Sequence, residues 1–206
     1  MKNKFILILF GFICIMGCKN KDTLPYYNDA SFTPVWDRHE LKSLHHVPDF
    51  SFVDQNDKTI TQKDLDGKIY IANFFFTTCG SVCPKMTKNL LKVQAAFPDN
   101  NEIAFISHTV TPWIDSVSRL KSYSKKYNLD DRWHLVTGDK AMIYQLARQS
   151  YFAEEEPGYD KDSSAFLHTE HILLIDKDKH IRGIYNGTLE LEIDRLISDI
   201  KLLLKE

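Results

Sequence analysis

The sequence predicts an α/β domain whose central mixed sheet is flanked by helices. Apolar runs of strand length alternate along the chain with segments in which apolar residues recur at helical spacing. The run at 68–76 is apolar at nearly every position, as expected for a central strand covered on both faces. Beyond its apolar N-terminus, the 206-residue chain has enough residues for one domain with a sizeable core.

The first half of the domain opens with a predicted N-terminal hairpin extension. Two short apolar segments flank a polar turn at 55–57, and Thr61 is suited to cap a helical turn that ends at Gly67. The apolar run at 68–76 is the next strand. A helix follows it, because apolar residues recur every three or four positions between 83 and 97.

The second half alternates strands and helices in the same way. A strand is expected at 103–110, and Thr111-Pro112 then opens a capped helix, because the missing N–H of Pro would be unpaired in the first turn anyway. A strand at 133–136 and a helix at 141–147 come next. An acidic, turn-rich loop at 152–164 follows, which is either solvated or docks a partner. The chain closes with a strand pair at 171–175 and 181–185 and an amphipathic helix at 191–204.

The N-terminus predicts a lipoprotein signal peptide at 1–17. Two lysines precede an apolar stretch that is too short to span a bilayer. Its end, Ile-Met-Gly-Cys, resembles a bacterial lipobox in which Cys18 becomes the lipidated first residue. A plain signal peptide or an uncleaved anchor is the alternative. We therefore expect a tether at 18–44 and a domain at 45–206, lipid-anchored to a membrane of the bacterial cell envelope, with the domain outside the cytoplasm.

The charge of the chain gives no support for a nucleic-acid partner. The chain has 26 Lys and Arg against 28 Asp and Glu, a formal net charge of -2 that becomes -4 when Lys2 and Lys4 leave with the signal peptide. A mildly acidic protein lacks the basic footprint that binding to nucleic acid requires.

The use of cysteine singles out one pair. Of four cysteines, Cys14 would leave with the signal peptide and Cys18 would carry lipid, so Cys79 and Cys83 are the free thiols of the mature chain. A structural disulfide framework is thereby excluded. In an oxidising compartment, a lone close pair indicates either redox chemistry or metal binding.

Cys79 and Cys83 follow the central strand and open a helix. Four residues apart, they would share one helix face, and the unpaired amides of the first turn favour the thiolate. Open α/β sheets place their sites at the carboxyl ends of strands, so this arrangement is thioredoxin-like. Two thiolates can cycle between dithiol and disulfide or can hold a soft cation such as Cu(I). Thioredoxin-type enzymes usually have two residues between their cysteines, whereas three intervene here.

A third metal ligand is sought among eight histidines. Most fall in the tether, in a turn or in strands, where solvated or structural roles are the default: His39, His45, His46, His108, His134 and His180. His171 lies inside a strand. His168 comes just before that strand, at a junction that faces the cysteine turn in a thioredoxin-like sheet. With Cys79 and Cys83 it would suit three-coordinate copper and, on ligand type alone, also Zn(II).

The chain resembles the Sco/SenC family of membrane-tethered copper proteins. The resemblance rests on Phe-Thr-Thr-Cys-Gly-Ser-Val-Cys-Pro-Lys-Met at 76–86 and on His168-Thr169 before an Ile-Leu-Leu-Ile-Asp strand. Pro112, Asp115 and Thr137-Gly138 extend it over the domain from Val47 onward. The chain departs from the family pattern at three positions, where Gly80 replaces a common Pro and Leu167 and Thr111 replace common Asp residues.

This resemblance implies a thioredoxin-like fold that binds copper, as Cu(I), Cu(II) or both, through Cys79, Cys83 and His168. It also implies a metallochaperone that helps to build the binuclear copper centre of cytochrome c oxidase. The partner would be the copper-receiving oxidase subunit or another cuproprotein.

Other functions compete with copper delivery. A thiol:disulfide oxidoreductase would use Cys79 as the attacking thiol and Cys83 as the resolving thiol to reduce cysteines of a copper-site partner. Both activities can share one site, so whether the chain is an enzyme stays open. A peroxidase is disfavoured because Thr78 has no matching Arg. A vestigial site is the least favoured, because all three candidate ligands are present.

Overall fold

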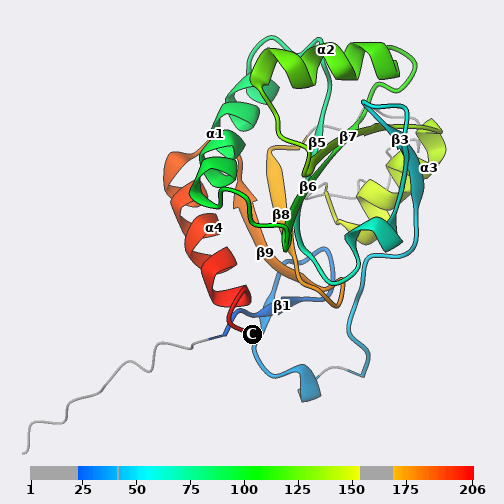
Figure 1. The fold of residues 1–206 in the computed structure, drawn as a ribbon. Coiled ribbons are helices and arrows are strands. Elements are labelled where there is room, and N and C mark those ends of the chain that lie inside the picture. The colour runs from blue at the N-terminus through cyan, green and yellow to red at the C-terminus, as the bar shows by residue number, and fades with distance from the viewer. Residues whose placement is uncertain (1–22, 41, 154–168) are drawn as a thin grey trace, which may run out of the picture.

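A nine-stranded mixed sheet runs through the residues that the computed structural model describes, 23–40, 42–153 and 169–206 (Figure 1). The strand order is β2-β1-β9-β8-β5-β6-β7-β3-β4. The strands are β1 (Tyr26–Tyr27), β2 (Pro34–Val35), β3 (Ser51–Asp54), β4 (Thr59–Thr61), β5 (Ile69–Phe75), β6 (Ile103–Thr109), β7 (Trp133–Thr137), β8 (His171–Ile175) and β9 (Ile181–Asn186). Strands β5, β6 and β7 run parallel, and the other pairs are antiparallel.

The helices cover both faces of this sheet. They are α1 (Val82–Ala96), α2 (Val117–Tyr127), α3 (Lys140–Gln145), which continues as a π-helical turn at Leu146–Ser150, and α4 (Glu190–Leu203), with short 3₁₀ turns at Arg38–Glu40 and Gln62–Leu65. Helices α1 and α4 pack side by side on one face, and α3 lies on the other (Figure 1). The predicted mixed sheet flanked by helices and the predicted N-terminal hairpin, β3 and β4, are confirmed.

Strand β5 is central because every one of its side chains is buried. Alternate residues point to opposite faces of a strand. Ile71 and Phe75 accordingly join the core under α1, α2 and α4, whereas Tyr70 and Phe74 join the core on the side of α3. Burial of both faces explains the unbroken apolar run in the sequence.

Helix α1 begins directly after the cysteine turn. Pro84 lies in its first turn, where backbone N–H groups have no intrahelical acceptor, so Pro removes no hydrogen bond there. Met86, Leu90 and Val93 lie on its buried face. The helix ends at Ala96, as expected before Pro98, because proline disfavours the helical conformation of the residue that precedes it.

The predicted helix at Thr111-Pro112 was wrong in its start. Residues 111–115 form a turn in which the amides of Ile114 and Asp115 donate to the Thr111 carbonyl at 2.8 and 2.9 Å. Helix α2 starts only at Val117, where the Ser116 side chain accepts from the Arg119 amide. Asp115 is the reason for the difference, because its fully buried carboxylate binds groups before the helix and draws this segment inward.

The described part of the segment expected to be a tether is folded onto the domain. Tyr27 pairs with Ile181, so β1 and β2 extend the sheet past β9. The guanidinium of Arg182 donates to the Leu24 and Pro25 carbonyls at 2.8 and 3.1 Å and also pairs with Asp176 and Glu206. The sequence did not predict β1 and β2 because the segment is polar, and a short strand at the edge of a sheet needs few apolar residues. No helix in the described ranges is long and apolar enough to span a bilayer.

Candidate metal and thiol site

The cysteine turn joins β5 to α1 at the carboxyl end of the central strand. The Cys79 amide donates to the Phe76 carbonyl at 3.2 Å, which closes a tight turn. The Cys83 amide then donates to Cys79 Sγ at 3.3 Å, so the first sulfur caps the first turn of the helix. Both thiols are free; Cys79 is partly exposed and Cys83 is 5% exposed. The two thiols therefore lie together at the start of the helix, and their use as metal ligands or as a redox pair stays a prediction.

The two thiols differ in acidity. Burial by itself raises the pKa of Cys79, but hydrogen bonds from the amides of Cys83, Ser81 and Val82 outweigh it and lower the pKa below its usual value. Burial raises the pKa of Cys83 to about 12, and the neighbouring Cys79 adds to the rise. Cys79 is thus the accessible, more acidic thiol, and Cys83 keeps its proton in the metal-free protein at neutral pH.

A buried carboxylate anchors the strand end from which the turn departs. Asp115 is 0% exposed and accepts hydrogen bonds from the Thr77 amide at 3.1 Å, the Thr109 hydroxyl at 2.5 Å and the Thr111 hydroxyl at 3.0 Å. The Thr77 hydroxyl also donates to it. Because Thr77 lies two residues before Cys79, Asp115 ties the cysteine turn to the ends of β6 and to the turn after it.

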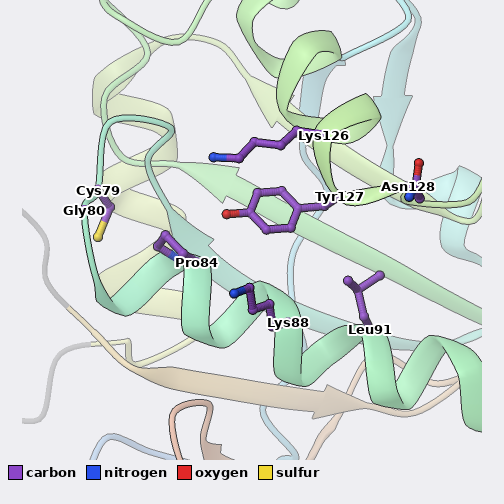
Figure 2. A pocket seen from close by; sticks show the side chains of 8 residues that line it. All are labelled: Cys79, Gly80, Pro84, Lys88, Leu91, Lys126, Tyr127 and Asn128. Carbon is purple, nitrogen blue, oxygen red and sulfur yellow. The ribbon is translucent and has the colours of Figure 1, made fainter.

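A groove of about 710 Å³ opens beside Cys79, between α1 and the end of α2 (Figure 2). Cys79 and Gly80 lie at one end of it. Lys126 and Tyr127 extend from α2 toward the first turns of α1, where Pro84 and Lys88 line the facing wall (Figure 2). The thiol that is easiest to reach thus stands at the mouth of a hollow that a partner can enter.

Two of the predicted site residues cannot be placed. Cys18, His168 and the acidic segment at 154–164 lie outside the described residues, so lipidation of Cys18 and metal binding by His168 stay predictions. Among the described residues, no three His, Cys, Asp or Glu side chains gather as a metal-binding group. Cys79 and Cys83 offer two soft sulfur donors, and these fit a soft ion such as Cu(I).

The histidines expected to be structural have packed or hydrogen-bonded environments. His134 Nδ1 lies 3.1 Å from Asp54 Oδ2. His171 lies in β8, and its ring meets Phe32 edge to face. His45 was expected to be solvated, which was wrong: its Nε2 lies 2.8 Å from the Ser150 carbonyl. His108 is completely buried.

The sequence prediction missed two contributors to the site. The four hydrogen bonds of Asp115 were not foreseen, although three Thr residues and an Asp close to strand ends are a signal of a buried polar network. The α2 wall of the groove was also missed, because Lys126 and Tyr127 are far from Cys79 in the chain. Only the packing of α2 beside α1 brings them together.

We expect Gly80→Ala to stabilise the fold by about 0.4–1 kcal/mol, because the unfolded chain loses freedom. A Cβ at Gly80 would meet no atom within 4 Å, and its φ lies outside the left-handed range. Gly138→Ala is the contrasting control, since its Cβ would lie 2.7 Å from Phe52. Urea unfolding of both variants measures the difference, and a loss of stability in Gly80→Ala would show that the turn needs glycine.

Comparison with known proteins places this geometry in a family. The SCO1/SenC family model matches residues 38–205. A SCO1/SenC family lipoprotein from Bacillus anthracis str. Ames superposes with a TM-score of 0.68 at 29% identity, covering 78% of this chain and 95% of that one. BsSco, described as a Sco family cytochrome c oxidase assembly protein with a disulfide switch, gives 0.64 at 30% identity over 76% and 92%. Bradyrhizobium japonicum ScoI with copper bound gives 0.61 at 28% over 77% and 99%. The predicted thioredoxin-like fold is confirmed by these structures.

Proposed function

Because the chain belongs to the SCO1/SenC family, we propose that it is a copper metallochaperone that supports assembly of the binuclear copper centre of cytochrome c oxidase. The observation that carries the proposal is the Cys79–Cys83 pair, held after the end of β5 with Cys79 partly exposed and Cys83 buried. The copper-bound state of the Bradyrhizobium japonicum relative and the oxidase-assembly role stated for BsSco support it. Copper is the cargo of such a protein, and the partner is the oxidase subunit or another cuproprotein that receives it.

Copper would be held by Cys79, Cys83 and His168, as Cu(I), Cu(II) or both. Two thiolates and an imidazole match the ligand preference of this metal. The exposed Cys79 would be the first ligand that a partner's thiol displaces, because the buried Cys83 cannot be approached first. Copper then moves from one sulfur to the next by ligand exchange, without a free ion in solution.

We infer a lipid anchor at Cys18 that holds the domain outside the cytoplasm, on a membrane of the cell envelope. The support is the lipobox-like sequence before Cys18 and the Bacillus anthracis relative, which is described as a lipoprotein. A metallochaperone anchored in this way would stay close to a membrane-bound oxidase.

A second candidate function is reduction of a partner's disulfide. The specific observation is that one thiol of the pair is accessible and the other is shielded, an arrangement suited to attack and resolution. Cys79 would attack the partner disulfide and form a mixed disulfide, and Cys83 would then displace the partner's sulfur. The pair loses two electrons and two protons, and the partner gains them as two thiols.

Titration of the reduced full chain with Cu(I), against a competing chelator, tests the proposal. We expect one tightly bound Cu(I), with Cys79→Ser and Cys83→Ser each weakening binding at least a hundredfold. His168→Ala should weaken it less and change the copper spectrum, whereas His171→Ala, three residues away, should not. Stoichiometric binding that survives loss of either cysteine would contradict a copper site at this pair.

The reductase function has its own readout. Metal-free His168→Ala protein that reduces the disulfide of a copper-site peptide at the wild-type rate would favour it. Weakened copper binding in His168→Ala, with that reductase activity intact, would separate the two functions, because the cysteines are needed for both.

A further inference from the structure

The two helices that flank the cysteine turn carry charge of one sign. Helices α1 and α2 together contain seven Lys and Arg residues and no Asp or Glu. The whole chain has 26 basic and 28 acidic residues, so 19 basic residues face 28 acidic ones elsewhere. The net charge of the whole chain conceals this asymmetry, because Lys88 and Lys126 come from separate segments and line one groove with Cys79 only in the folded protein.

The groove between these helices holds two of those basic residues. Lys88 of α1 and Lys126 of α2 line it (Figure 2), and neither ammonium group pairs with a carboxylate of the described residues. Lys92, one turn beyond Lys88, shows the contrast, because it pairs with Glu190 at 3.0 Å. Within the part of the chain that the structure describes, the groove thus offers two cations that no carboxylate pairs with.

The other lining residues add contact area and chemistry. Tyr127, over whose ring the Lys126 ammonium lies at 5.2 Å, and Leu91 supply aromatic and apolar surface. Cys79 is one of the lining residues and lies at one end of the groove (Figure 2). A ligand that fills the groove therefore meets positive charge, apolar surface and the thiol in one continuous site.

We propose that this groove docks an acidic, cysteine-containing segment of the protein that exchanges copper or electrons with Cys79. The inference rests on the proposed function and adds to it the place and chemistry of partner recognition. Carboxylates of the segment would pair with Lys88 and Lys126 while its cysteine reaches Cys79. The acidic remainder of the chain would repel such a partner from other faces, so the charge pattern also sets the orientation of approach. A flat lipid surface fits less well, because it neither enters a groove nor brings a thiol.

Two matched probes test the preference for acidic partners. Each is a short peptide with one cysteine, joined as a mixed disulfide to 5-thio-2-nitrobenzoate and flanked by Glu residues in one peptide and by Gln in the other. The reduced full chain, in a non-ionic detergent, transfers two electrons to this disulfide. One equivalent of peptide thiol and one of the coloured nitrothiobenzoate are released, and the protein pair becomes a disulfide. The ratio of the two rates cancels any change in the reactivity of Cys79 itself.

At low ionic strength we expect the acidic probe to react about tenfold faster than the neutral one, a ratio that falls toward one as salt is added. Lys88→Glu with Lys126→Glu should bring the ratio to one or below. Lys63→Glu with Lys68→Glu makes the same change in net charge near the amino end of β5, and should keep the tenfold preference.

A preference that both double variants lose equally would overturn the proposal, because net charge alone would then explain it. An equal rate for the two probes with the wild-type chain would overturn it too, and would leave the basic face to another anion such as a lipid headgroup. Cu(I) titration of Lys88→Glu with Lys126→Glu keeps the two hypotheses apart. If this double variant binds copper normally but no longer prefers the acidic probe, both the copper site and the docking groove are supported. If the wild-type chain does not bind copper, only the proposed function is contradicted.

Discussion

Asp115→Ala is expected to lower the free energy of unfolding by about 3–5 kcal/mol and the melting temperature by about 10 °C. Four hydrogen-bond donors from Thr77, Thr109 and Thr111 converge on this fully buried carboxylate. Alanine would leave them without an acceptor, and each buried unpaired group is costly. Thermal and urea unfolding measure the loss.

The same substitution should weaken Cu(I) binding without touching a ligand. Thr77 lies between β5 and Cys79, so its release frees the cysteine turn. Thr111→Val is the graded control, since it removes one donor at nearly constant volume and should cost only about 1 kcal/mol. Equal losses in the two variants would show that the carboxylate is not the centre of the network.

His108 is expected to make the fold sensitive to acid. Its ring is completely buried among Phe50, Phe52, Phe74 and Tyr151, with no hydrogen-bond partner for either nitrogen in the described structure. Burial lowers its pKa from 6.5 to about 3. Below pH 6.5, His108 therefore binds a proton in the unfolded chain but stays neutral in the folded protein. The contribution of neutral His108 to the free energy of unfolding is fully present above pH 6.5. It is lost as the pH falls toward 3, by about 1.4 kcal/mol per pH unit.

Urea unfolding of wild type and His108→Phe from pH 7.5 down to pH 4 measures this effect. The difference in free energy between the two proteins should change in favour of the variant by about 3 kcal/mol over that range, whatever its starting value. His108→Leu is a second variant, in case the Phe ring of His108→Phe packs poorly. The same pH-dependent difference from wild type is expected for it. Parallel pH profiles for all three proteins would contradict a neutral, buried imidazole.

The site could be predicted from sequence where its residues are local. Cys79 and Cys83 lie four positions apart at the start of a helix, so a strand followed by a helix brings them together without help from the rest of the chain. The apolar run of β5 and the alternation of strands and helices likewise predicted the sheet, because a strand that is buried on both faces is apolar at nearly every position. The late start of α2 and the docking of residues 24–35 could not be predicted from local sequence. They depend on Asp115 and Arg182, whose partners are distant in the chain.

The pair of thiols, the central strand that precedes them and the family of the chain could therefore all be read from the order of the residues. The folded structure was needed to show that Cys79 is partly exposed while Cys83 is buried, that Asp115 holds the turn, and that Lys88 and Lys126 line one groove beside the thiol. The physical reason is the range of each effect. Helical and strand periodicity act over a few residues, whereas burial, desolvation and charge clustering arise from elements that pack together from far apart in the chain.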